Sequence, residues 1–182
     1  MNYTEEELID GCKRRSAKHE EVFYKKYYGY VMGISLSYSK ERDLALEITN
    51  DVFLKFFASI KKVESFQTVK AWLRRITVNT AIDYYRKNKK YQNHSDLEID
   101  VPNEVEVNAL SSLGFEDIIK LINQLPDDQK LVFNLYEIEG YSHKEISDRM
   151  GITEGSSRVY LTRAKVKLRQ LVHIHLKEYE GR

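Results

Sequence analysis

A run of basic and hydroxyl side chains near the C-terminal end of the sequence has the composition of a DNA-binding surface. Between Glu154 and Arg169 there is one acidic residue, and the cations are Arg158, Arg163, Lys165, Lys167 and Arg169. Arg and Lys side chains bind phosphates, and a short polar stretch ahead of them can form hydrogen bonds with base edges. This pattern predicts a helix that contacts DNA. On charge alone, a basic amphipathic helix whose charges merely face solvent is the alternative.

The residues before this run predict the elements that would position it. Ser142 and Glu145 have the spacing of a capping box, which starts a helix. Gly151 follows at a place where a helix end often requires a positive φ, and Thr153 can cap the next helix. A short helix, a glycine turn and a second, basic helix together predict a helix-turn-helix, whose second helix normally enters a DNA major groove.

A second candidate surface lies in the middle of the sequence. On a helix, residues at positions i, i+4, i+8 and i+11 share one face, and here they are Arg75, Asn79, Asp83 and Arg86. Tyrosines and further lysines follow this stripe. Cations bind phosphate, and aromatic rings stack on bases that have left the duplex. The stripe therefore suits DNA, and a solvated helix face with tyrosines in the core is the alternative.

The composition of the whole chain favours a soluble globular protein. The 182 residues are 42% hydrophobic and 31% charged, with a mean hydropathy of −0.55. No apolar run reaches membrane-spanning length, and the N-terminal sequence is acidic where a signal peptide would be basic and then apolar. The single cysteine, Cys12, excludes an intramolecular disulfide and a cysteine-rich metal site. These features predict a cytoplasmic protein without membrane insertion.

The net charge of +1 conceals an uneven distribution. Residues 69–90 carry seven Lys or Arg side chains and one acidic side chain, whereas residues 91–119 carry seven acidic side chains and no Lys or Arg. Two basic segments therefore flank an acidic one. The distribution, more than the total, is what matters for a nucleic-acid partner.

Periodicity predicts an all-α fold. The chain has two Pro and eight Gly and no alternating strand pattern of useful length. Apolar residues at helical spacing predict four helices that begin near Thr4, Lys18, Glu41 and Val69. Two further helices would precede the helix-turn-helix. One begins near Phe115 and includes Leu125, and the other includes Leu131, Val132, Leu135 and Tyr136.

Residues 91–110 separate these helices into two groups. This stretch is polar and acidic and lacks steady periodicity, so it predicts a flexible linker. The expected organisation is thus two small helical domains, residues 1–90 and 111–182, joined by a linker at 91–110.

Motifs in both halves resemble one family. Leu125-Pro126, Tyr141-Ser142-His143-Lys144-Glu145-Ile146 and Arg163-Ala164-Lys165-Val166-Lys167-Leu168-Arg169 resemble region four of bacterial RNA polymerase sigma factors of the sigma-70 family, above all the extracytoplasmic-function (ECF) group. Phe66, Ala71-Trp72-Leu73-Arg74-Arg75-Ile76, Asn79-Thr80-Ala81-Ile82-Asp83-Tyr84 and Arg86 resemble the segment with which ECF factors recognise the −10 element. Residues 47–55 resemble the helix that clamps the coiled coil of the polymerase β′ subunit. Together these patterns cover nearly all of the chain.

The resemblance implies a promoter-specificity subunit with two DNA-binding surfaces and a surface for the polymerase. For the −35 element the implied residues are Ser156, Ser157, Arg158, Val159, Tyr160, Thr162, Arg163 and Lys167. For the −10 element they are Phe66, Trp72, Arg75, Asn79, Asp83, Tyr84, Arg86 and Lys87, with the loop at about 59–67. For core polymerase they are Glu47, Asn50, Asp51 and Lys55.

The same resemblance implies the partners. They are core RNA polymerase, through its β′ coiled coil and β flap, promoter DNA, and an anti-sigma factor, which is the usual partner in this family. The free protein would be a monomer. No catalysis, cofactor or metal is implied. The acidic linker could imitate a phosphate backbone inside the nucleic-acid channel of the polymerase, although a tether without an electrostatic role is the alternative.

The sequence departs from the family pattern at two positions in the reading helix. Ser157 stands where many relatives have Val, which weakens an expected apolar contact between the two reading helices. Tyr160 stands where Arg or Lys is common, which puts −35 readout in doubt. In the first helix of the pair, Ser147 replaces a common Ala but is small enough for close helix approach.

Three other interpretations compete with this one. One of them, a purely structural helical adaptor, would not explain the uneven charge distribution. A free-standing helix-turn-helix regulator would explain residues 142–169 but not the pattern around Trp72. An enzyme would require an active site, and none is recognisable: His143 and Glu145 match half of a zinc deaminase signature without its cysteines. His173 and His175 lie two residues apart, so on a helix they point to different faces and are poor co-ligands.

Overall fold

The computed structural model describes residues 3–62, 69–89 and 114–180. Within these ranges every regular element is helical, as the sequence predicts. The chain forms two compact units, Met1–Tyr85 and Arg86–Arg182. The predicted linker at 91–110, Phe66 and most of the loop at about 59–67 lie outside the described residues. No helix within the described ranges is long and apolar enough to span a membrane.

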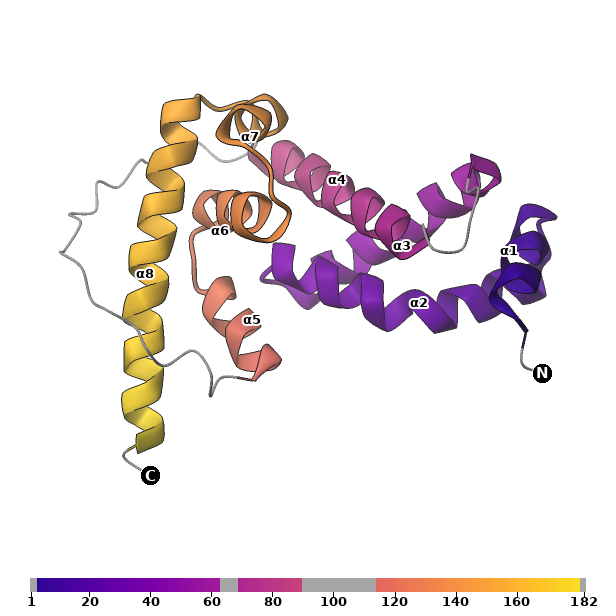
Figure 1. Ribbon diagram of the computed structural model, residues 1–182, viewed down its shortest axis with the longest axis horizontal. Helices are drawn as coiled ribbons and strands as arrows, with labels where there is room; N and C mark the ends of the chain where they lie inside the picture. The colour runs from indigo at the N-terminus through magenta and orange to yellow at the C-terminus, as the bar shows by residue number, and fades with distance from the viewer. Residues whose placement is uncertain (1–2, 63–68, 90–113, 181–182) are drawn as a thin grey trace. The chain divides into compact units, whose positions relative to one another are not determined.

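The first unit is built from four α-helices, which Figure 1 labels in chain order. They are α1 (Glu5–Lys13), α2 (Ala17–Tyr38), α3 (Arg42–Ser59) and α4 (Val69–Lys89), with a 3-10 turn, η1 (Ile60–Lys62), after α3. The first residues of α4 follow the undescribed stretch, and its last residues run past the unit boundary. All four helices begin within one residue of the predicted positions.

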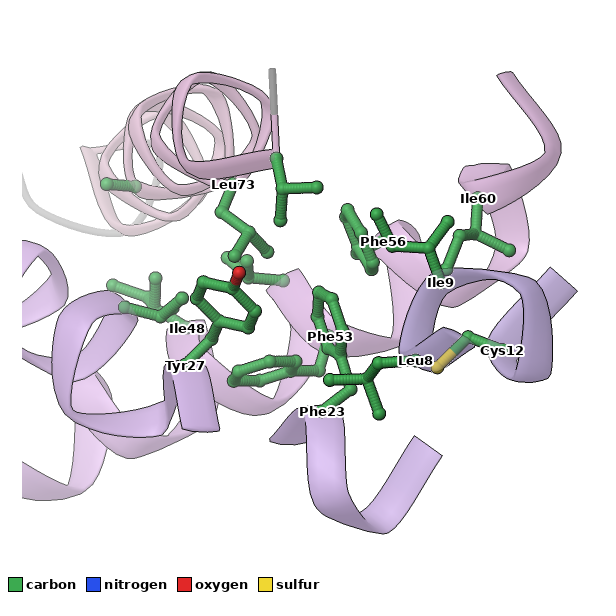
Figure 2. Packing of buried hydrophobic residues seen from close by; sticks show 14 residues of the cluster. Leu8, Ile9, Cys12, Phe23, Tyr27, Ile48, Phe53, Phe56, Ile60 and Leu73 are labelled. Carbon is green, nitrogen blue, oxygen red and sulfur yellow. The ribbon is translucent and has the colours of Figure 1, made fainter. Parts of the chain in front are cut away.

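An aromatic cluster forms the core of this unit (Figure 2). Phe23 on α2 is fully buried and stacks on Phe56 of α3, with ring centroids 4.7 Å apart at 15°. Tyr27 and Phe57 also lie against Phe23, at 4.6 and 5.7 Å. The cluster further includes Leu8, Ile9 and Cys12 of α1 and Val69, Leu73 and Ala81 of α4. Burial of these large side chains is what holds α4, with its polar stripe, against α2 and α3.

The turn between α1 and α2 depends on close packing. Arg15 adopts a positive φ of 61°, and Ser16 precedes α2. His19 Nδ1 forms a hydrogen bond with Ser16 Oγ at 2.8 Å, and the His19 ring lies directly over Gly11 of α1. A Cβ at position 11 would lie 2.1 Å from His19 Cγ, so no side chain fits there without movement.

The second unit contains α5 (Phe115–Asn123), α6 (Asp127–Phe133), a π-helical segment η4 (Asn134–Ile138), α7 (His143–Met150) and α8 (Glu154–Glu180). The long helix α8 packs against α5, α6 and α7. Its core is aliphatic, and among its buried residues are Leu121, Ile122, Leu125, Leu131, Val132, Leu135, Ile146, Met150, Leu161, Ala164 and Val172.

Two features of this unit differ from the predicted helices. The helix expected to include Leu125 ends at Asn123, because the residue before Pro126 is disfavoured in the α conformation. The next helix does not continue through Tyr136 as an α-helix. It changes to π geometry at Asn134, whose carbonyl accepts the Glu139 N–H at 3.0 Å. Such π segments are rare and occur often at functional sites.

Candidate nucleic-acid interface

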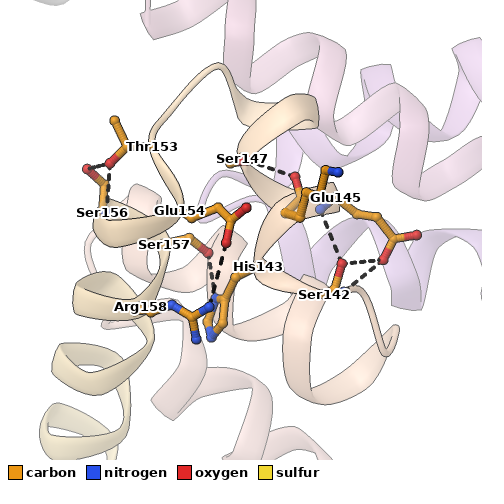
Figure 3. Close-up of polar contacts among 10 residues, drawn as sticks. Ser142, His143, Glu145, Ser147, Thr153, Glu154, Ser156, Ser157 and Arg158 are labelled. Atoms are coloured by element: carbon orange, nitrogen blue, oxygen red, sulfur yellow. Dashed lines mark hydrogen bonds and ion pairs between the residues drawn. The ribbon is translucent and has the colours of Figure 1, made fainter.

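The start of α7 is fixed by the capping box that the sequence predicts. Ser142 Oγ accepts the Glu145 backbone N–H at 3.3 Å, and Glu145 Oε2 accepts the Ser142 N–H at 2.9 Å (Figure 3). These hydrogen bonds hold the pKa of the Glu145 carboxyl below its ordinary value. At the other end Gly151 adopts the left-handed conformation, with φ 68° and ψ 40°. The short helix is therefore closed at both ends.

The start of α8 is capped as predicted. Thr153 Oγ1 accepts the Ser156 N–H at 3.0 Å and lies 2.9 Å from Ser156 Oγ. Arg158 and Glu154, one turn apart, form an exposed ion pair at 3.6 Å. Such surface pairs contribute little stability, so Arg158 can exchange this partner for a phosphate or a base.

Most of the predicted −35 residues lie on the accessible side of α8. Arg158, Thr162 and Lys167 are exposed, Val159 is 46% exposed, and Ser156 and Arg163 are partly exposed. Tyr160 is half-buried at the edge of this surface. A helix that presents hydroxyl, aliphatic and cationic groups in its first three turns can contact base edges, thymine methyl groups and phosphates.

Ser157 is a correction to the predicted surface. Its side chain is fully buried and lies 2.9 Å, Oγ to Nδ1, from His143 of α7. The predicted weakening of the contact between the two helices is thus offset by a hydrogen bond. The imidazole of His143, itself 9% exposed, also stacks on Tyr136 of η4, with centroids 4.5 Å apart at 23°. Ser157 faces α7 and does not present its hydroxyl to DNA. The sequence carried a hint of this pairing, since Ser157 stands where an apolar residue is expected.

The predicted −10 stripe lies on α4. Arg75, Asp83, Arg86 and Lys87 are exposed, and Asn79 is partly exposed. Trp72 is half-buried and packs against the aromatic core. The stripe therefore has an accessible cationic and polar face, as DNA binding requires.

Two predicted surfaces share contacts in the first unit. Tyr84, predicted for the −10 element, donates a hydrogen bond to Asp51 Oδ2 at 3.0 Å, and burial together with this carboxylate raises its pKa to about 12. Lys55 on α3 donates to Thr80 Oγ1 at 3.0 Å and lies 3.6 Å from Asp83. These contacts tie α3 to α4.

The other two residues predicted to contact core polymerase, Glu47 and Asn50, are exposed on α3. Asn50 accepts a hydrogen bond from the Tyr24 hydroxyl at 3.2 Å. Glu47 and Asn50 share their side of the helix with Leu54, which is 68% exposed, and Leu46, which is 39% exposed. Neither leucine is among the residues predicted to contact core polymerase, although Leu54 lies within the stretch 47–55. The signal was present, because position 54 lies off the buried stripe of Ile48, Val52 and Phe56.

No cluster of three or more His, Cys, Asp or Glu side chains that could hold a metal occurs in the part of the chain that the structure describes. Burial raises the pKa of the Cys12 thiol to about 12, so it stays protonated and unreactive.

Comparison with known families assigns both units. The family model described as Sigma-70 region 2 matches residues 23–91, and the one described as Sigma-70, region 4 matches residues 115–168. The chain belongs to the sigma-70 family of RNA polymerase sigma factors. The region 2 match decides against the free-standing regulator, which would have no such domain.

Curated relatives place it in the ECF group. The chain is 30% identical over 156 residues to the ECF RNA polymerase sigma factor SigM of Bacillus subtilis, covering 83% of this chain and 93% of that protein. It is 25% identical to the ECF RNA polymerase sigma-E factor of Haemophilus influenzae, covering 89% and 92%. The present chain is therefore an ECF sigma factor, which directs promoter recognition by RNA polymerase. The sigma factor family is not enzymatic.

Two solved structures resemble the chain at lower similarity. One is the sigma factor RpoE in complex with the anti-sigma factor NepR from Bartonella quintana, at 23% identity and a TM-score of 0.49, covering 85% of this chain and 98% of that one. The other is CnrH in complex with the cytosolic domain of CnrY, at 15% identity and a TM-score of 0.47, covering 92% and 96%.

Proposed function

We propose that the exposed start of α8 reads the −35 element of the promoters that this ECF sigma factor recognises. The observation that carries the proposal is the capped, outward-facing end of the helix, with Ser156, Arg158, Val159, Thr162 and Arg163 on its accessible side and Lys167 beyond them. Hydroxyl and aliphatic groups would contact bases, while the cations would hold phosphates. Ser157 is left out because it is buried, and Tyr160 borders the surface.

The α4 stripe would receive the opened −10 element. Arg75, Asn79, Asp83, Arg86 and Lys87 would contact the non-template strand, together with Phe66 and the loop at about 59–67. A base flipped out of the duplex costs a few kcal/mol of unstacking, which contacts in this region would offset. Trp72 and Tyr84 are held by the core and by Asp51, so they would act by shaping the stripe.

The exposed side of α3 would bind the β′ coiled coil of core polymerase. Glu47 and Asn50 supply polar contacts there, and Asp51 and Lys55 border them. Leu54 adds an apolar anchor, because an exposed leucine within a polar surface is a common centre of an interface. The second unit would bind the β flap.

The domain organisation would be residues 1–90 and 111–182, joined by a flexible linker at 91–110. The linker carboxylates would follow the positively charged nucleic-acid channel of the polymerase. The free protein would be a cytoplasmic monomer held inactive by an anti-sigma factor, a class of partner that the RpoE structure contains.

The first experiment mixes purified protein with core polymerase from its own source. Co-elution, together with run-off transcripts from genomic promoter fragments, supports the proposal and supplies the promoter sequence. Binding to duplex DNA without any binding to core polymerase would overturn it.

Matched variants then test each surface. Arg158→Ala should reduce transcription from a −35-dependent promoter about tenfold, because one good base or phosphate contact contributes about 1–3 kcal/mol. Lys177→Ala, exposed near the far end of the same helix, is the control and should have no effect. Equal effects of the two changes would contradict the proposed reading surface.

For the polymerase surface, Leu54→Asp should weaken co-elution with core polymerase by tenfold or more, since it places a charge at a proposed apolar anchor. Lys25→Ala on α2 is the control, because its ion pair with Glu21 is highly exposed and contributes little.

The linker is tested by replacing its acidic residues with Asn and Gln. Reduced initiation with unchanged core affinity supports imitation of a phosphate backbone. Unchanged initiation would leave the linker as a tether without an electrostatic role.

A further inference from the structure

His143 lies where three elements of the second unit meet. It is the first residue of α7, its ring stacks on Tyr136 of η4, and its Nδ1 lies 2.9 Å from Ser157 Oγ of α8. Both members of the hydrogen-bonded pair are buried. Figure 3 shows this contact between the two helices of the helix-turn-helix. None of the roles proposed above uses this residue.

The position of Ser157 sets which residues α8 presents to DNA. Successive residues on a helix are 100° apart, so fixing Ser157 against α7 places Ser156 and Arg158 on the two flanks of the accessible surface. An apolar contact would resist a small rotation of α8 weakly. A buried hydrogen bond is directional, and breaking it leaves a polar group without water.

We propose that His143 is a positioning residue for −35 recognition, which holds the first turn of α8 in the orientation that reads DNA and does so best with a neutral imidazole. The inference rests on the proposed −35 role of α8 and names a residue that does not itself contact DNA.

The charges around His143 support this role. Burial, and next the Arg158 guanidinium, lower the pKa of His143 below its ordinary value of 6.5, and Lys165 acts in the same direction, while Glu154 acts in the opposite one. Lys165 is in turn paired with Glu137 of η4 at 2.7 Å.

Protonation of the imidazole would therefore add a cation next to Arg158, one of the proposed reading residues. A neutral ring can accept or donate the bond to Ser157, whereas an imidazolium can only donate. The folded orientation is thus favoured above about pH 6.5 and is weakened as the pH falls through the lowered pKa of His143.

The first arm of the test uses the holoenzyme and two templates. One is a duplex promoter that includes the −35 element recovered by run-off transcription, and the other is a fork junction that begins downstream of that element. His143→Phe keeps the stacked ring and loses the hydrogen bond, and His143→Asn keeps a hydrogen-bonding group near the place of Nδ1 and cannot be protonated. His173→Phe and His173→Asn, at an exposed position near the far end of α8, are the controls.

At pH 7.5 we expect His143→Phe to reduce binding to the −35 duplex about fivefold, the effect of losing one buried hydrogen bond, with no change on the fork junction. His143→Asn should keep most of the binding. Between pH 7.5 and 5.5 the duplex-to-fork ratio should fall for the wild-type protein and stay constant for His143→Asn. Equal losses on both templates, or equal pH profiles, would overturn the proposal.

The second arm uses the free full-length chain and needs no promoter. The backbone NMR signals of Ser156 and Arg158 should shift with pH, with the same midpoint as the titration of the His143 imidazole. This shift should vanish in His143→Asn. If it persists in His143→Asn, the positioning role is wrong whatever the promoter result. If the NMR shift vanishes as expected but the wild-type holoenzyme binds the −35 duplex no better than the fork junction, α8 is positioned by His143 but the proposed −35 role is wrong.

Discussion

Aromatic rings dominate the core of the first unit, whereas in the second unit short-range polar contacts add to an aliphatic core around α7 and the start of α8. Around Phe23 the rings of Tyr27, Phe53, Phe56 and Phe57 pack from two helices. The Ser142 capping box fixes the start of α7, and the Thr153 cap fixes the start of α8. The hydrogen-bonded pair of His143 and Ser157 joins the two helices. Apolar burial is strong and tolerant of small shifts, while hydrogen bonds are weaker and directional.

The difference suits the two proposed tasks. A surface that opens DNA and binds polymerase benefits from long helices that do not deform, and the aromatic core supplies this. A surface that reads base edges requires a helix at a defined rotation, and directional bonds supply that. The two units should therefore respond differently to substitution, with the largest losses of stability in the aromatic core.

The largest effect is expected for Phe23→Ala. Removing a fully buried ring that contacts four other rings should cost the first unit about 3–5 kcal/mol of unfolding free energy. The sole tryptophan, Trp72, packs against this core, so its fluorescence during urea unfolding reports the change. A loss below about 1 kcal/mol would show that the aromatic core is not what holds this unit.

Gly11→Ala should come next. The added Cβ would lie 2.1 Å from His19 Cγ, and relieving this overlap should cost about 1–3 kcal/mol. Gly29→Ala, in α2, is the matched control, because no atom lies within 4 Å of its added Cβ. That change should stabilise the unit by about 0.5–1 kcal/mol, since glycine is unfavourable inside a helix. If both changes altered the unfolding free energy in the same direction, the close packing of His19 over Gly11 would be contradicted.

The two capping boxes permit a direct comparison of the units. Thr4 with Glu7 starts α1, and Ser142 with Glu145 starts α7, by the same hydrogen bonds. Thr4→Ala and Ser142→Ala should each cost about 1 kcal/mol of local stability, measured by amide hydrogen exchange. Only Ser142→Ala should also weaken binding to the −35 duplex. If Thr4→Ala weakened that binding equally, the cap would not act through the reading helix.

Both caps should respond to acid in the same direction. Hydrogen bonds from the cap residues hold the pKa of Glu7 and of Glu145 below the ordinary value of 4.5. Their contribution is therefore complete above that pH and is lost as the pH falls through the lowered pKa.

The smallest effect is expected from the titration of His143. Because its pKa is lowered in the folded protein, the second unit should be most stable above pH 6.5 and should lose stability as the pH falls below it. Hydrogen exchange of the α7 and α8 amides between pH 7.5 and 5.5, corrected for intrinsic rates, measures this in the wild-type protein and in His143→Asn. If the difference in hydrogen exchange between the wild-type protein and His143→Asn were the same at every pH, the titration of the imidazole would be excluded as its cause.

The sequence was sufficient to predict much of this structure because many of its signals are local. Ser142, Gly151 and Thr153 act within a few residues, and each performs the predicted function. Apolar spacing likewise predicted the helices of the first unit, and Phe23, Ile48 and Leu73, which lie at that spacing, are buried.

The features that could not be predicted depend on what lies opposite a residue. Ser157 stands where an apolar residue is expected, but the sequence does not show that its hydroxyl is paired with His143 of α7. Asp51 and Lys55 look like free surface charges in sequence, but α4 places Tyr84 and Thr80 within hydrogen-bonding distance of them. The π segment Asn134–Ile138 is defined by its backbone hydrogen bonding, which includes the bond from the Glu139 N–H to the Asn134 carbonyl, and it leaves no pattern in the residues.

The composition of the first core has a consequence during protein synthesis. Its cluster joins Leu8 of α1 with Leu73 and Ala81 of α4, so this core cannot be completed until α4 has been translated. At about 5–20 residues per second, part of the apolar surface of α1, α2 and α3 stays uncovered for several seconds on each ribosome. The nascent chain should therefore require a chaperone, or rapid helix formation, most strongly in the interval before α4 emerges.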